Sequence, residues 1–212
     1  MAKLLEISDR DCTLYSVVVS DEMLIDGKIN SFDELTLEER HSKFSIYIYC
    51  WQDPIRFNDK VISKNTKKIK FLWFHEENTL CFFANSESDL YYVTSKLVQK
   101  CKWILHKKLQ FQNRLDAVFS NSSFFSELIS VVIKRQIGDV EKLLTISVNQ
   151  LSREKKLNLI SRYEVCSLNY FFSGIYFSID CNSVISFHDT DTFEEILIIV
   201  EGINNENYKH HQ

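Results

Sequence analysis

Basic and aromatic side chains recur at helical spacing in the middle of the chain, and they are the best candidates for a binding function. Lys96, Lys100, Trp103 and Lys107 follow one another at steps of three or four residues, so they fall on one stripe of a predicted helix. Arg114 joins this stripe if the helix continues that far. Lysines along a helix could follow a phosphate backbone, and an exposed tryptophan could stack on a base. They could equally bind an acidic protein or simply form a solvated outer face.

The distribution of charge favours a binding role for the same region. Residues 96–162 contain 13 Lys or Arg against 5 Asp or Glu, which gives this segment a net charge of +8. Residues 1–95 carry a net charge of −5 and residues 163–212 a net charge of −7, so the whole chain has a net charge of −4. A basic segment between acidic flanks suits nucleic acid, an acidic protein, or the acidic flank of a second copy in a homo-oligomer.

Histidines beside acidic residues are weaker candidates, for catalysis or metal binding. His75 precedes Glu76 and Glu77 at a predicted bend, and His188 precedes Asp189 at a predicted strand end. Either group could hold a general base or a metal ion. A turn rich in charged residues is more often only solvated, so neither group is assigned a catalytic role.

A divalent-metal-dependent nuclease is the alternative function. One type of nuclease site uses an acid on one strand and a Glu-x-Lys on the next to hold magnesium and activate water. Asp139 followed by Glu154-Lys155-Lys156 has a tolerable spacing for such a site. Glu154 nevertheless lies in a polar run typical of a solvated helix start. The sequence therefore predicts no catalytic residue and no metal ligand.

The scarcity of glycine excludes several enzyme classes. The four glycines, at positions 27, 138, 174 and 202, are too far apart for a GxGxxG turn, a Walker A loop or a GxSxG elbow. Rossmann dehydrogenases, P-loop NTPases, typical protein kinases and α/β-hydrolases are thereby disfavoured, and no cofactor is predicted. The six cysteines contain no CxxC pair, which argues against ordinary zinc fingers and favours reduced core thiols.

The sequence also predicts a soluble, cytoplasmic protein without a membrane partner. Residues 1–11 carry three acids and no apolar run, unlike a signal peptide. The longest uncharged stretch, residues 165–179, is too short to span a bilayer and contains polar residues.

Local patterns predict a mixture of strands and helices. Runs of β-branched and aromatic residues predict strands over 13–19, 44–51, 69–74, 79–84, 166–180 and 183–188. Turns are expected at Pro54 and over 63–68. Capping residues and helical spacing predict helices over 31–41, from Ser86 or Ser88 to at least Leu105, over 124–137, after Ser152, and over 192–200.

These elements alternate without a βαβ rhythm, so the predicted fold class is α+β, with antiparallel sheet and packed helices. We expect a single compact domain over residues 1–212, with potential halves near 1–115 and 116–212. A hairpin followed by a capped helix occurs twice, about 104 residues apart, and this suggests an internal duplication of two ββα units. The favoured function is a non-enzymatic interaction or regulatory protein, a subunit of a larger assembly that binds through the basic helix.

Overall fold

The computed structural model describes residues 9–18, 27–28, 33–57, 60–120 and 125–209. The chain divides into two compact units, an N-terminal unit (Cys12–Lys107) and a C-terminal unit (Met1–Asp11 with Lys108–Gln212). Both units combine antiparallel strands with helices, so the predicted α+β class is confirmed. The single domain over residues 1–212 and the halves at 1–115 and 116–212 stay predictions.

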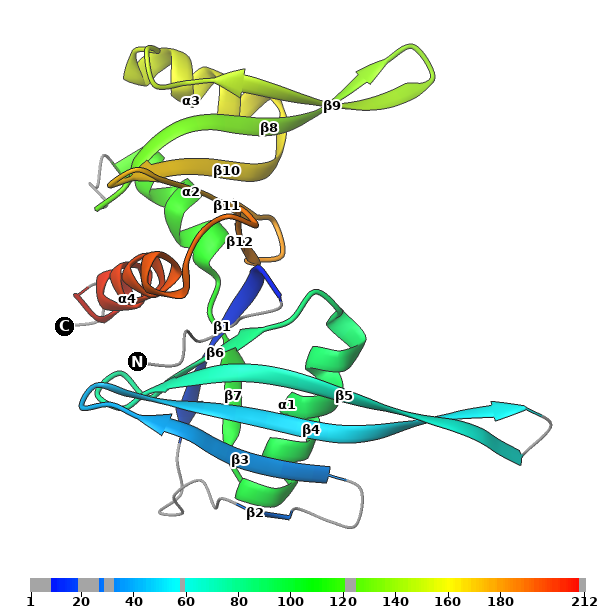
Figure 1. Cartoon of the computed structure of the whole chain (residues 1–212). Helices are drawn as coiled ribbons and strands as arrows, with labels where there is room; N and C mark the ends of the chain where they lie inside the picture. The colour runs from blue at the N-terminus through cyan, green and yellow to red at the C-terminus, as the bar shows by residue number, and fades with distance from the viewer. Residues whose placement is uncertain (1–8, 19–26, 29–32, 58–59, 121–124, 210–212) are drawn as a thin grey trace. The chain divides into compact units, whose positions relative to one another are not determined.

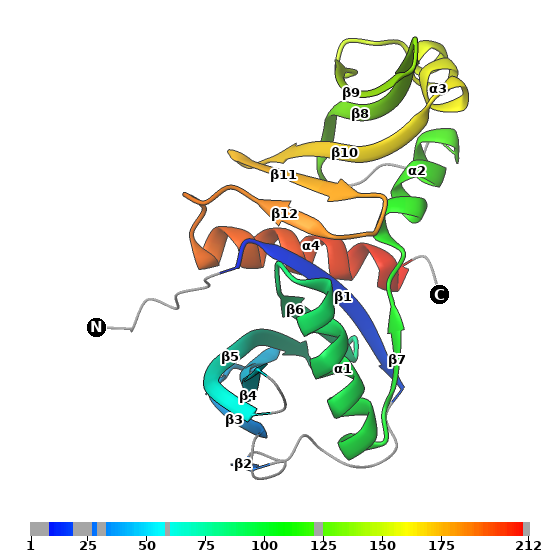
Figure 2. The ribbon, with the colours of Figure 1, turned by 90° about the vertical axis from the view of Figure 1, so that its right-hand side faces the viewer.

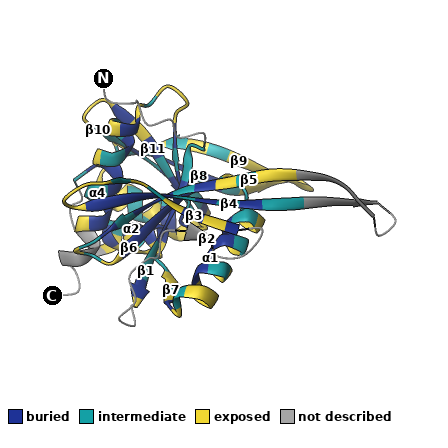
Figure 3. Ribbon diagram, turned by 60° about the horizontal axis from the view of Figure 1, so that its bottom comes forward, coloured by how far each residue is buried: buried dark blue, intermediate teal, exposed yellow. Residues whose placement is uncertain are grey.

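An antiparallel sheet forms most of the N-terminal unit (Figure 1). In chain order its strands are β1 (Asp11–Val18), β2 (Gly27–Lys28), β3 (Asp33–Arg40), β4 (Phe44–Phe57), β5 (Lys60–Phe74), β6 (Thr79–Phe83) and β7 (Ile104–Lys107). They lie in the order β2-β3-β4-β5-β6-β1, and β7 pairs with β1. The predicted strands at β1, β4, β5 and β6 are confirmed. The hairpin of β4 and β5 extends well beyond the neighbouring strands (Figure 3).

One long helix, α1 (Glu87–Cys101), packs on a face of this sheet (Figure 2). Ser86 caps it, because the Ser86 Oγ accepts a hydrogen bond from the backbone N–H of Asp89 at 3.3 Å. Leu90, Val93 and Leu97 recur at helical spacing and are buried against the sheet. The resulting core is rich in aromatic rings and comprises Val17, Leu35, Tyr47, Tyr49, Trp51, Ile69, Phe71, Leu80, Phe82, Leu90, Val93, Leu97 and Trp103.

Among the described residues, the C-terminal unit contains five antiparallel strands, which we call the C-terminal sheet, and three helices. Its elements are α2 (Gln110–Ser120), β8 (Glu127–Ile137), β9 (Val140–Ser147), α3 (Arg153–Arg162), β10 (Glu164–Phe172), β11 (Ile175–Asp180), β12 (Ile185–Phe187) and α4 (Phe193–Lys209). Its strands lie in the order β12-β11-β10-β8-β9, which places β9 at the end of the order. The predicted segment 166–180 forms two strands, β10 and β11.

Two of the three helix starts predicted in this unit are confirmed, those of α3 and α4. The Ser152 side chain accepts a hydrogen bond from the backbone of Lys155 at the start of α3. At α4, the Thr192 N–H donates to Glu195 Oε2 at 2.7 Å, and the Glu195 N–H donates to Thr192 Oγ1 at 3.3 Å. This reciprocal capping box fixes the start of α4, which continues beyond the predicted end near Val200 to Lys209.

The helix predicted over residues 31–41 is wrong, because residues 33–40 form strand β3; residues 31 and 32 lie outside the described residues. Exposure alternates along β3, with Asp33 and Leu35 buried and Glu34 and Thr36 exposed. The strand pairs with β4 from Asp33↔Trp51 to Arg40↔Ser45. Burying Leu35 in the sheet outweighs the local helix signal, as tertiary packing commonly does.

The helix predicted over residues 124–137 is also wrong, because residues 127–137 form β8. The run from Leu128 to Ile133 is almost continuously apolar, and such a run fits the helical and the strand periods equally well. Hydrogen bonding to β9 and β10 stabilises the strand over the helix. Gly138, which directly follows this segment, has a φ of +62° in the two-residue turn from β8 to β9.

The turns predicted at Pro54 and over residues 63–68 lie inside the long β4–β5 hairpin instead. The pairing of β4 with β3 ends at Trp51, so Pro54 pairs with β5 alone and occupies an edge position, where proline is tolerated. Here the two strands pair only with each other, so polar residues are tolerated on both faces. The polar composition of this segment was therefore a misleading turn signal.

Candidate interaction surface

Two of the predicted basic residues lie on the solvent-facing side of α1. Lys96 and Lys100 are four residues apart, one helical turn, and Lys100 is exposed in the last turn. The Lys96 ammonium lies over the ring of Tyr92, 5.3 Å from its centroid. Among the described residues, no acidic side chain forms an ion pair with Lys96 or Lys100.

The predicted stripe fails after Lys100, because α1 ends at Cys101 and not at or beyond Leu105. Lys102 takes a left-handed conformation, with φ 53° and ψ 31°, and redirects the chain. Trp103 then enters the core with 1% of its surface exposed, and its ring lies 5.7 Å from that of Trp73. The expectation that Trp103 stacks on a base from an exposed helical position is wrong, since its ring is enclosed by the protein.

Lys107 and Arg114 are not on this helix either. Lys107 lies on β7, opposite Tyr15 of β1, and is half-buried. Arg114 belongs to α2 in the C-terminal unit and is only 1% exposed. Its guanidinium lies 4.7 Å from the ring centroid of Tyr170 and 5.7 Å from that of Phe125, and its Nη1 donates to Ser126 Oγ at 3.2 Å. The placement of all five residues along one helix is therefore wrong.

The structure exposes two apolar side chains on α1 that the sequence analysis missed. Tyr91 is 75% and Val98 is 40% exposed, although each directly follows a buried core residue, Leu90 or Leu97. They are seven residues apart, two turns, so they lie on the same side of the helix. We define the outer face of α1 as six residues of this helix, which include the two exposed apolar residues and the two lysines: Tyr91, Ser95, Lys96, Val98, Gln99 and Lys100.

The outer face of α1 has an apolar edge and a basic edge. At 100° per residue, Tyr91 and Val98 fall on one side of the exposed arc, and Lys96 and Lys100 fall on the other. The uncharged residues Ser95 and Gln99, both exposed, lie between the two edges. Such a surface matches a partner that presents apolar and acidic groups side by side.

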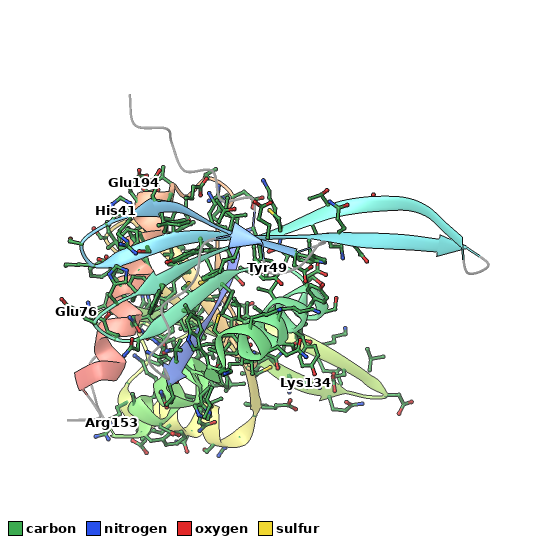
Figure 4. All side chains as sticks on the ribbon, turned by 90° about the horizontal axis from the view of Figure 1, so that it is seen from below. His41, Tyr49, Glu76, Lys134, Arg153 and Glu194 are labelled. Atoms are coloured by element: carbon green, nitrogen blue, oxygen red, sulfur yellow. The ribbon has the colours of Figure 1, made fainter. Side chains whose placement is uncertain are left out.

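A buried polar cluster holds the basic edge of α1 against the sheet. The Tyr92 hydroxyl donates a hydrogen bond to Asp33 Oδ1 at 3.0 Å, and Asp33 is only 3% exposed. The Tyr92 ring stacks on Trp51 at a centroid distance of 5.3 Å. Burial, followed by the hydrogen bond to Asp33, raises the pKa of Tyr92 to about 12. Burial and the charge of Asp33 likewise raise the pKa of the nearby Tyr49 (labelled in Figure 4).

We expect the free energy of unfolding of Tyr92→Phe to depend less steeply on pH in the alkaline range than that of the wild type. Folded Tyr92 keeps its proton up to a pKa of about 12, whereas an unfolded tyrosine releases it near 10. Between these values the folded state binds more protons, so the free energy of unfolding falls as the pH rises. Urea unfolding of both proteins at several alkaline pH values checks this expectation. Identical slopes for the two proteins would contradict it.

The histidine groups have structural roles. His75 Nε2 is hydrogen-bonded to Ser45 Oγ at 2.9 Å, and its ring meets Trp73 edge to face. His188 Nδ1 lies 2.8 Å from Thr190 Oγ1, and its backbone N–H donates to Asp191 in the turn before α4. These contacts organise local backbone.

The two acids considered for a nuclease site are both exposed. Asp139 lies in the β8–β9 turn, and Glu154 lies in the first turn of α3. In the described residues, no group of three or more His, Cys, Asp or Glu side chains could hold a metal ion. The six cysteines, all within the described ranges, form no disulfide.

Comparison with known proteins adds no functional assignment. No protein-family model and no curated protein sequence matches the chain. Within the described part of the chain, every helix is too short or too polar to cross a bilayer. The geometry of the outer face of α1 is therefore the main basis for a functional proposal.

Proposed function

We propose that this chain is a non-enzymatic interaction subunit of a larger assembly, and that the outer face of α1 binds an acidic, partly apolar segment of a partner protein. The observation that carries the proposal is the exposure of Tyr91 and Val98 beside Lys96 and Lys100, which have no acidic partner among the described residues. Exposed aromatic residues are enriched at protein interfaces, and positive charges beside them favour a partner of negative charge.

An acidic protein suits this surface better than nucleic acid does. Nucleic-acid grooves usually combine several cations with aromatic rings on which bases stack. Trp103 and Arg114, two of the residues expected to supply these contacts, are each only 1% exposed. The apolar edge formed by Tyr91 and Val98 would instead be covered by apolar side chains of a protein. Nucleic acid therefore becomes an alternative outcome of the binding test.

The cluster of Asp33, Tyr92 and Trp51 supports the proposal, because it fixes the helix that carries the surface. A rigid helix loses little conformational entropy on binding, which favours affinity.

The internal duplication of two ββα units stays a prediction. In both units a hairpin precedes a capped helix, at β5-β6-α1 and at β11-β12-α4.

We expect the double substitution Lys100→Glu/Lys102→Glu to weaken binding of an acidic peptide about tenfold, because it reverses two exposed charges on and next to the outer face of α1. The probe is a fluorescein-labelled amphipathic peptide of Glu, Leu and Ala, and the measurement is fluorescence anisotropy at low and moderate salt. Labelled oligothymidine and a DNA duplex serve as nucleic-acid probes.

The control is Lys43→Glu/Lys155→Glu, which changes the net charge equally at two exposed lysines that are not part of α1. The proposal predicts peptide binding that weakens with salt and is unaffected by the control. Absence of peptide binding at low salt, or an equal effect of both double variants, would contradict it. Binding of oligothymidine or the duplex but not of the peptide would indicate that the surface binds nucleic acid instead.

A further inference from the structure

The end strand of the C-terminal sheet, β9, is long, regular and exposed. It pairs with β8 over eight consecutive residues, from Val140↔Ile137 to Ser147↔Ser130, without a shift in register. In the strand order β12-β11-β10-β8-β9 it has no second strand neighbour among the described residues. Figure 1 shows β9 at the margin of this sheet. Its outer backbone edge is therefore available for pairing.

The hairpin geometry identifies the backbone groups on that edge. In a hairpin with a two-residue turn, the residues that flank the turn form a hydrogen-bonded pair, here Ile137 and Val140. Every second residue of β9 from Val140 therefore bonds to β8. Val148, which continues this series, donates its N–H to the carbonyl of Ile129 at 2.7 Å. The N–H and C=O groups of the alternate residues point away from β8: Glu141, Leu143, Thr145 and Ser147.

Other strand edges carry protection that β9 lacks. Edge strands usually avoid association by being short, bulged or highly charged. β7 has only four residues, and β3 contains a register shift between Leu37 and Glu39 and exposes several charged side chains. β9 has eight residues in regular register, and its side chains include Leu143 at 64% and Val140 at 56% exposure.

The charges of β9 are compatible with self-association. Glu141 is bound within its own hairpin by Lys134, with Oε1 and Nζ 3.0 Å apart (Lys134 is labelled in Figure 4). Two antiparallel copies of β9 that continue one sheet are related by a two-fold axis perpendicular to it, so one residue faces its own copy. A register centred on Glu141 or Lys142 opposes like charges, which is unfavourable. A register centred on Leu143 or Leu144 opposes leucines instead.

We propose that two copies of this chain pair through β9, in an antiparallel, leucine-centred register that joins their C-terminal sheets edge to edge. The outward N–H and C=O groups of Leu143 and Thr145 supply the central hydrogen bonds, and the exposed Leu143 side chains are covered by the partner strand. This interface is separate from the outer face of α1 and does not depend on it. The partner is identified as a second copy because a leucine-centred register opposes no like charges and lets the partner strand cover the exposed Leu143 side chain.

The decisive variant is Thr145→Pro, compared with Thr145→Val. Proline removes an N–H that points outward, so the β8–β9 ladder keeps its hydrogen bonds while an added strand loses one. Valine is similar in shape to threonine and keeps the N–H. A second variant, Leu143→Lys, introduces a charge opposite the partner strand at a side chain that is 64% exposed and therefore contributes little to folding. Circular dichroism establishes that each variant is folded.

Sedimentation equilibrium of the full chain measures the association. We expect the wild type and Thr145→Val to reach the dimer mass at a protomer concentration of about 100 µM, the range for a small interface. Thr145→Pro and Leu143→Lys should stay monomeric. A monomeric wild type at this concentration would overturn the proposal, as would dimers that persist in every folded variant. If Thr145→Pro does not fold, Leu143→Lys alone decides.

Discussion

Trp103→Ala is expected to lower the free energy of unfolding by about 3–5 kcal/mol, the usual cost of deleting a buried aromatic side chain. Trp103 is 1% exposed and belongs to the core formed by α1 and the N-terminal sheet. Its ring packs 5.7 Å from that of Trp73, so truncation removes an aromatic contact and leaves a cavity. Urea unfolding followed by circular dichroism measures the change.

Tyr91→Ala is the matched control for this prediction, because it truncates an exposed aromatic residue on α1, the helix that precedes Trp103 in the chain. At 75% exposure, Tyr91 should contribute less than about 0.5 kcal/mol to stability. The account also predicts that Tyr91→Ala weakens peptide binding while leaving the fold intact. If Trp103→Ala were as stable as the wild type, the assignment of Trp103 to the core would be wrong.

Arg114→Ala is expected to lower the free energy of unfolding by about 2–4 kcal/mol. The guanidinium is enclosed between the rings of Tyr170 and Phe125, and it donates a hydrogen bond to Ser126. Alanine removes these contacts and leaves a cavity beside two aromatic rings. The Ser126 hydroxyl also loses its hydrogen bond from Arg114. The side chain thus stabilises the C-terminal unit and is not part of a binding surface.

Arg114→Met separates packing from charge in the same position. Methionine fills a similar volume without charge, and buried cations can often be replaced by apolar residues at small cost. We therefore expect Arg114→Met to recover part of the stability lost in Arg114→Ala, as measured by urea unfolding. A fully stable Arg114→Ala variant with reduced ligand binding would instead place Arg114 in an interface.

Local signals in the sequence predicted the elements whose structure is determined locally. Ser86, Ser152 and Thr192 each cap a helix, and the strands at β1, β4 and β6 contain β-branched and aromatic residues. These features act through bonds between residues three or four positions apart or through side-chain shape. They need no knowledge of the rest of the fold.

The failures arose where pairing between strands decided the outcome. Residues 33–40 and 127–137 have helix-like patterns, yet each is held as a strand by its neighbours in the sheet, β4 for β3 and both β9 and β10 for β8. The continuous apolar run in β8 carries both periods, so the sequence alone could not separate them.

The candidate site was only partly predictable for a related reason. The end of α1 carries no glycine or proline, and Lys102 takes the left-handed conformation that glycine usually supplies. Extending the helical period past Cys101 therefore placed Trp103, Lys107 and Arg114 on a stripe that does not exist. The exposure of Tyr91 and Val98 could have been predicted, because their positions do not fall on the buried stripe of Leu90, Val93 and Leu97.

Amide chemical shifts recorded on addition of the acidic peptide will show whether the outer face of α1 is the contact surface. We expect the largest shifts between Tyr91 and Lys102, and we expect Lys100→Glu/Lys102→Glu to abolish them. The amides of α3, which carries the control residue Lys155, should not shift. Saturable binding with its largest shifts outside α1 would show that the contact surface lies elsewhere.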